Sequence, residues 1–125
     1  MTTPSMPGWN LGVRFVLEVA AFAGLAAMGW RLGPGSVRWI AVVVVPVVAA
    51  VVWGVFNVRD DPSRSGAAPV EVDGVVRLLL ELVILGGGAT AVAFTVGPAL
   101  GIVFAVAIVG HYLLSGDRVA WLVRS

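Results

Sequence analysis

Two acid–base pairs are the residues in this sequence whose type and spacing best suit chemistry. The first pair is Arg14 and Glu18, and the second is Arg77 and Glu81, which repeats the first 63 residues later. Within each pair the spacing of four residues places both side chains on one helix face. Each pair lies at the start of a long apolar segment. Placing an ionised group in such a segment costs free energy, so a charge found there marks a candidate functional site.

A histidine near the end of the last apolar segment extends this candidate site. His111 lies about one turn from the end of a segment that runs opposite to the two that carry the pairs. We therefore predict that all these polar side chains form one layer at a common depth, with Asn57 and Arg118 at its mouth. The members of the predicted layer are Arg14, Glu18, Arg77, Glu81 and His111.

Both pairs have the arginine before the glutamate, which is the less favourable order on an isolated helix. Depth in the membrane explains the order better, because a long arginine stem can extend toward the headgroups. The shorter glutamate lies deeper and needs a partner, either its own arginine or that of the other pair. Two interpretations stay open: the charges fix helix packing, or they bind an ion, a proton or a polar headgroup.

Several classes of site are disfavoured by the residue inventory. The chain has no cysteine and one histidine, so we predict no metal site and no cofactor. A net charge of +1 gives no support for nucleic-acid binding. The neighbouring Asp60 and Asp61 are expected to lie solvated in a loop.

The elements that must position these residues are membrane helices. The chain of 125 residues is 59% hydrophobic and 12% charged, whereas soluble domains are about 45–50% apolar and about 25% charged. We predict an all-α, four-transmembrane-helix bundle in a single domain covering residues 1–125. The four spans are expected at residues 11–30, 37–56, 75–96 and 99–115, each near the roughly 20 residues that cross a bilayer.

The connections divide the chain into two tandem helical hairpins. Gly33-Pro34-Gly35 joins the first two spans and Gly97-Pro98 joins the last two, at nearly the same offset as the charged pairs. Hairpin one covers about 11–56, a polar loop covers 57–74, hairpin two covers about 75–115, and a short tail covers 116–125. The repeat is parallel, with a pseudo-two-fold axis along the membrane normal.

Arginine distribution predicts the orientation. Six arginines lie on the side that holds both termini and the middle loop, and two lie on the opposite side. Positive residues favour the cytoplasmic side, so we expect both termini in the cytoplasm. The five tryptophans lie near span ends, as an aromatic belt at the membrane surface would require.

Several short motifs, taken in order, resemble a known family. They are Asn10 to Glu18, Trp53 to Asn57 followed by Arg59 to Arg64, Arg77 to Leu82, and His111-Tyr112 with Arg118 to Leu122. The sequence is similar over nearly its whole length to the YrdB-like family of small bacterial four-span membrane proteins. The resemblance implies a multi-pass protein of the bacterial inner membrane and brings no assigned activity.

Two functions from different classes remain. The first is a structural or accessory membrane protein whose partners are the lipid bilayer and either a second copy or another membrane protein. The alternative is a minimal proton- or cation-coupled transporter or channel that uses Glu18 and Glu81. An enzyme acting on a lipid headgroup is a minor third possibility, with Arg14 and Arg77 on phosphate and His111 as acid or base.

Overall fold

The computed structural model describes residues 3–64 and 66–125 and is dominated by helices. Its elements, in chain order, are α1 (Gly8–Leu32), α2 (Val37–Val55), β1 (Phe56–Asn57), β2 (Val70–Glu71), α3 (Gly74–Thr95), α4 (Pro98–Leu114) and α5 (Gly116–Arg124). The all-helical class expected from the sequence is therefore confirmed, apart from one short pair of parallel strands.

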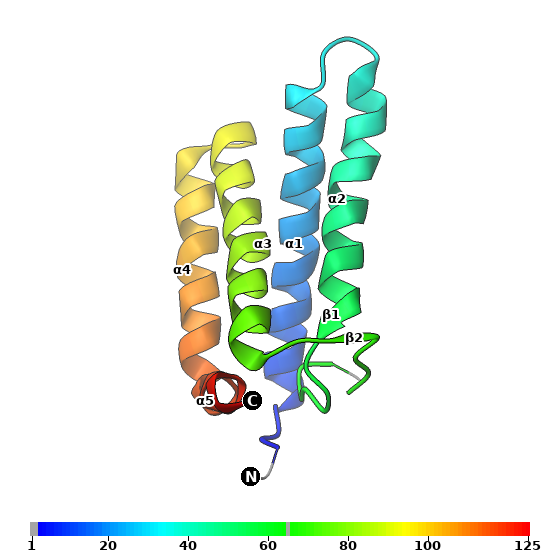
Figure 1. The fold of residues 1–125 in the computed structure, drawn as a ribbon. Helices are drawn as coiled ribbons and strands as arrows, with labels where there is room; N and C mark the ends of the chain where they lie inside the picture. Colours follow the sequence, from blue (N-terminus) through cyan, green and yellow to red (C-terminus); the bar gives the residue numbers. More distant parts are fainter. Residues whose placement is uncertain (1–2, 65) are drawn as a thin grey trace.

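The four longer helices lie side by side, and both termini lie at the same end of the molecule as the β1–β2 pair (Figure 1). Helix α1 packs against α2 and α3, and α3 packs in turn against α4. The core between them contains mainly aliphatic side chains, together with Trp53 and Phe104. The central position of α1 and α3 matters for the site, because these two helices carry the charged pairs.

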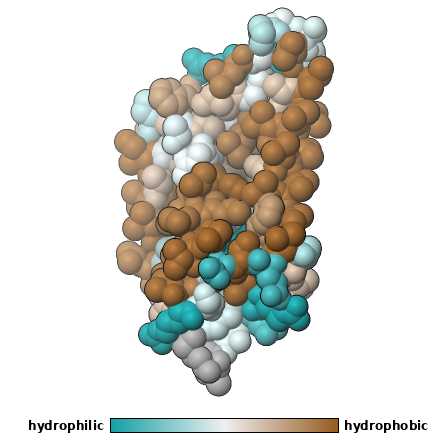
Figure 2. Space-filling view, in the orientation of Figure 1, coloured by the Kyte–Doolittle hydropathy of each residue, from teal (hydrophilic) through white to brown (hydrophobic). Residues whose placement is uncertain are grey.

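Within the described residues, three helices are long and apolar enough to cross a membrane, namely α1, α2 and α3. Helix α4 has 17 residues and bends by 73° into α5, and the two together would make a fourth candidate span. Hydrophobic side chains cover most of the length of the helices, and hydrophilic ones gather toward the end that carries the termini (Figure 2). These features are compatible with a multi-pass membrane protein.

Small residues bring α1 and α3 into close contact. A Cβ atom added to Gly88 on α3 would lie 2.6 Å from the Cα of Ala21 on α1. One added to Gly24 would lie 2.9 Å from the carbonyl oxygen of Gly88. Real Cβ atoms do not approach so closely, so this spacing between the helices requires glycine at both positions. The close approach lets a side chain from α1 reach groups on α3.

The predicted tail is in fact a helix that packs under the bundle. Trp121 and Leu122 of α5 are buried and form a small second core with Val58, against which Leu78 packs. The nine residues of α5 are fewer than the roughly 11–18 over which a helical period is usually read from sequence. A backbone hydrogen bond of 3.1 Å from the nitrogen of Gly74 to the carbonyl of Ser125 joins the end of the chain to the start of α3.

Candidate functional site

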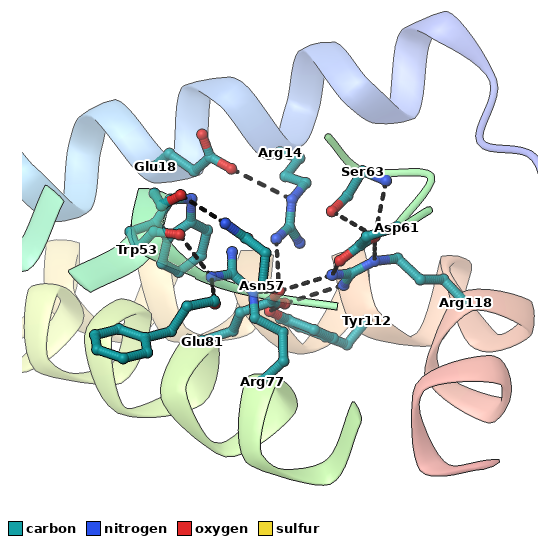
Figure 3. A network of polar contacts seen from close by, with 12 residues as sticks. Arg14, Glu18, Trp53, Asn57, Asp61, Ser63, Arg77, Glu81, Tyr112 and Arg118 are labelled. Carbon is teal, nitrogen blue, oxygen red and sulfur yellow. Dashed lines mark hydrogen bonds and ion pairs between the residues drawn. The ribbon is translucent and has the colours of Figure 1, made fainter. Parts of the chain in front are cut away.

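The carboxylate of Glu81 is the centre of a buried polar network (Figure 3). Its side chain is 0% exposed. Two arginines reach Oε2 from α1 and α3, with Arg14 Nη2 at 2.9 Å and Arg77 Nε at 2.7 Å. Arg118 of α5 donates to both oxygens, at 3.0 and 2.7 Å. The hydroxyl of Tyr112 on α4 donates to Oε1 at 2.6 Å, so four helices meet at one carboxylate.

Arg77 also joins α3 to the end of α2. Its Nη1 donates to the backbone carbonyls of Trp53 and Phe56, at 2.6 and 2.8 Å. The last carbonyls of a helix lack partners within the helix and carry partial negative charge, so a guanidinium there satisfies and stabilises them. The guanidinium also lies 4.7 Å from the ring centroid of Trp53, and that of Arg14 lies 5.2 Å from it.

These contacts correct two expectations. Arg14 and Arg77 do not extend outward to the headgroups, because their side chains are only 2% and 0% exposed. Trp53 is only 3% exposed and packs in the core, so it does not belong to a surface aromatic belt. Charged partners on neighbouring helices and an aromatic face turn these side chains inward, and the sequence pattern of one helix does not reveal them.

The loop after β1 adds a second buried carboxylate. Arg118 binds Asp61 through two hydrogen bonds, from Nε to Oδ1 at 2.8 Å and from Nη2 to Oδ2 at 2.6 Å. Asp61 Oδ1 also accepts from the backbone nitrogen and hydroxyl of Ser63, both at 2.9 Å. The expectation of a solvated Asp61 is wrong, because the residue is 1% exposed; its neighbour Asp60 is exposed.

Electrostatics around Asp61 favour its charged form. Burial acts to raise the pKa of this carboxyl, but the hydrogen bonds and charge of Arg118, aided by Ser63, outweigh it and hold the pKa below its usual value. The fork geometry explains why the residue is arginine, since a guanidinium matches a carboxylate with two parallel bonds. Arg118 therefore ties the loop and α5 to the carboxylate of Glu81.

The two residues predicted at the mouth of the layer are both buried. Asn57 is 1% exposed and donates from Nδ2 to the carbonyl of Gly54 at 2.6 Å. Arg118, also 1% exposed, lies within the network rather than at an opening. The bend between α4 and α5 explains the difference, because it turns the predicted tail back beneath α3.

Glu18 and His111 stand apart from the other predicted members. Glu18 is 19% exposed and forms an ion pair with Arg14, whose Nε lies 3.3 Å from Oε1. His111 is 2% exposed, and its ring lies edge-on against Tyr112 with centroids 5.3 Å apart. Neither ring nitrogen of His111 has a hydrogen-bond partner among the described residues.

Sequence reasoning missed Asp61 and Tyr112 as members of the site. Asp61 is followed by Pro62 and Ser63, a turn composition in which an aspartate commonly accepts from the backbone two residues on. Tyr112 is the one tyrosine in the chain and needs a hydrogen-bond partner where it lies in an apolar segment. We call the following set the charge network: Arg14, Glu18, Asp61, Arg77, Glu81, Tyr112 and Arg118.

The charge network is balanced when its ionisable groups carry their usual charges. Three guanidiniums face three carboxylates, and five of these six groups are almost fully buried. Removal of one partner from such a set leaves an uncompensated buried charge, which is strongly destabilising. The described residues include no group of three or more histidine, cysteine, aspartate or glutamate side chains suited to a metal ion. The arrangement therefore fixes charges in place and joins helices.

Comparison with known proteins identifies the family. Residues 12–109 match the model described as "Protein of unknown function (DUF2568)". The chain belongs to this family. It is also 39% identical to the "Uncharacterized protein YrdB" of Bacillus subtilis (strain 168) over 115 residues, which cover 92% of this chain and 94% of that relative. No solved structure matches. The resemblance to a YrdB-like family is thus confirmed, and the family brings no assigned activity.

Proposed function

We propose that this protein is a structural or accessory component of the bacterial inner membrane, with both termini in the cytoplasm. In this proposal α1 to α4 form a four-span bundle of two tandem hairpins, and α5 lies at the cytoplasmic surface. The arginine distribution and the shared end of the two termini support this orientation. The repeated Arg-x-x-x-Glu motif on α1 and α3 supports the tandem repeat.

The proposal rests on one observation: both carboxylate oxygens of Glu81 are occupied by hydrogen bonds and ion pairs. Three guanidiniums and one hydroxyl from four helices surround a carboxylate with no exposed surface. A carboxylate that loads and releases a proton or cation needs an approach path and a free coordination position. Glu81 has neither in the described structure, and it suits a fixed clamp that holds the cytoplasmic end of the bundle together.

The alternative, a proton- or cation-coupled transporter or channel, makes a different prediction. The transport proposal requires that replacing Glu18 or Glu81 with glutamine changes the flux. The structural proposal requires that replacing Glu81 with glutamine lowers the stability of the fold. The test uses the purified full chain in liposomes, with proton and monovalent-cation flux measured for the parent, Glu18→Gln and Glu81→Gln. Under the structural proposal, flux equals that of empty liposomes for all three proteins, and Glu81→Gln lowers the unfolding temperature.

Flux above empty liposomes that both substitutions abolish would overturn the structural proposal in favour of transport. An unchanged unfolding temperature for Glu81→Gln would overturn the clamp itself. Glu71→Gln is the matched control, because Glu71 also pairs with an arginine, Arg59, but is 51% exposed. Surface pairs of this kind contribute at most about 1 kcal/mol.

A further inference from the structure

A cavity of about 270 Å³ lies between the start of α1 and the loop after β1. Its lining combines opposite charges with apolar groups: Leu11, Arg14, Phe15, Glu18, Pro62, Ser63 and Arg64. Figure 3 shows the side chain of Arg14 extending from α1 between Glu18 and the loop residue Ser63. The cavity is thus bordered by the least buried acid of the charge network.

The charges that line the cavity select the class of ligand. Arg14 and Arg64 disfavour a simple cation, and Glu18 disfavours a ligand that carries only negative charge. A zwitterion satisfies both, with its anionic group toward the guanidiniums and its ammonium toward Glu18. The hydroxyl oxygen of Ser63, whose hydrogen is donated to Asp61, is a further acceptor at the wall.

Arg14 has unused hydrogen-bonding capacity next to this cavity. Its side chain is 2% exposed, and its Nη1 makes no hydrogen bond among the described residues. A buried donor without a partner is destabilising by about 1–3 kcal/mol. Because the nitrogens of Arg14 have almost no accessible surface, an anionic group in the cavity interacts with this guanidinium through its positive charge at the wall. This is an observation independent of the cavity and it points to a ligand.

The apolar rim indicates where the rest of the ligand lies. Phe15 is 65% exposed and Val19, one turn further along α1, is 51% exposed, so both face the surrounding lipid in a membrane protein. A headgroup in the cavity would leave its acyl chains along this apolar strip of α1. We propose that the cavity binds the headgroup of an aminophospholipid, with its phosphate toward Arg14 and Arg64 and its primary ammonium on Glu18.

This inference rests on the proposed membrane placement. It assigns a ligand to Arg14 and Glu18, which border the cavity, and leaves the contacts of Glu81 unchanged. The test is native mass spectrometry of the full chain in detergent, titrated separately with phosphatidylethanolamine, phosphatidylcholine and phosphatidylglycerol. Phosphoethanolamine and inorganic phosphate are titrated alongside, to separate a lipid from a soluble phosphate source.

We expect phosphatidylethanolamine to bind about tenfold more tightly than phosphatidylcholine, since a trimethylated ammonium cannot donate a hydrogen bond to Glu18. Glu18→Gln removes this preference, and Arg64→Gln weakens binding of every phospholipid. Glu71→Gln, at an exposed ion pair outside the cavity, leaves binding unchanged. Glu18→Gln and Arg64→Gln lower the unfolding temperature far less than Glu81→Gln does, which shows that the clamp is intact.

Any one of four results would overturn the inference. They are equal binding of phosphatidylglycerol and phosphatidylethanolamine, a preference that survives Glu18→Gln, phosphoethanolamine or phosphate binding as tightly as the lipid, and absence of any lipid binding. The clamp fails by a separate measurement, the unfolding temperature of Glu81→Gln, so the two failures are distinguishable.

Discussion

The two copies of the Arg-x-x-x-Glu motif have the same local sequence pattern and reach different environments. Glu81 is 0% exposed and is contacted by three arginines and a tyrosine, whereas Glu18 is 19% exposed and pairs with Arg14 at 3.3 Å. Arg14 forms ion pairs with both acids, and its contact with Glu81 on α3 is the shorter of the two, at 2.9 Å. The motif therefore places an arginine and a glutamate on the same helix face. Contacts from other helices determine how many partners each glutamate has.

The source of the difference is visible in the helices that follow each motif. After the second motif, Tyr112 on α4 and Arg118 on α5 supply donors to Glu81. Residues 47–55, which follow the first motif at a comparable distance along the chain, have the sequence VVAAVVWGV and contain no ionisable residue. Glu81 has more partners than Glu18 because the helix and the segment that follow its motif carry hydrogen-bond donors.

The largest effect that would test this contrast is expected from Glu81→Gln. Loss of the negative charge leaves three buried guanidiniums without their shared partner, and we expect a loss of about 3–5 kcal/mol of stability. Glu18→Gln changes a partly exposed pair and is expected to lose less than about 1 kcal/mol. Reversible unfolding in mixed micelles measures both; equal losses would remove the distinction between the copies.

Arg118→Lys tests whether the geometry of the fork matters as well as its charge. Lysine keeps the positive charge but cannot bind Asp61 with two parallel bonds while also contacting Glu81, so we expect a loss of about 2 kcal/mol. Limited proteolysis should cleave the loop after β1 faster in this variant. Arg59→Lys is the control, because Arg59 is 73% exposed. A parental cleavage rate for Arg118→Lys would contradict the bridging role.

Gly88→Ala tests the helix contact that lets Arg14 reach Glu81. An added Cβ would lie 2.6 Å from Ala21, so α1 and α3 must separate, and we expect a loss of about 2 kcal/mol. Gly86→Ala is the matched control, because nothing lies within 4 Å of its added Cβ. Thermal unfolding separates the two variants, and similar unfolding temperatures for both would show that the close approach is unimportant.

Tyr112→Phe removes the hydroxyl that donates a hydrogen bond to Glu81. The lost bond to Glu81 is 2.6 Å long and has a charged acceptor, which gives an expected loss of about 1–2 kcal/mol. In Glu81→Gln the same substitution should matter less, because the acceptor is neutral there. A full effect of Tyr112→Phe in that background would indicate that the hydroxyl acts through packing alone.

The smallest effect is the pH dependence contributed by Asp61. Its pKa is lowered in the folded protein, so its stabilising contribution is complete above its ordinary value of about 3.9 and is lost as pH falls through the lower native pKa. The difference in unfolding temperature between the parent and Asp61→Asn should therefore be largest above about pH 4 and shrink below it. A difference that grows on acidification would contradict the lowered pKa.

The sequence predicted the helices well because their signals are local. Long apolar runs and Gly-Pro turns gave the positions of α1 to α4, and the repeated spacing selected Arg14, Arg77 and Glu81. The role of Arg118 and the burial of Asp61 depend on the 73° bend between α4 and α5 and on a loop that folds back. Neither leaves a periodic pattern, so sequence reasoning placed Arg118 at a mouth and Asp61 in solvent.

In the proposed clamp, Glu81 rather than Glu18 is the acid that holds α1 against α3. Two double-mutant cycles test it most directly, one with Arg14→Gln and Glu81→Gln and one with Arg14→Gln and Glu18→Gln. The account predicts a coupling energy of about 1–2 kcal/mol for Arg14 with Glu81 and below about 0.5 kcal/mol for Arg14 with Glu18. A coupling to Glu18 equal to or larger than that to Glu81 would contradict it.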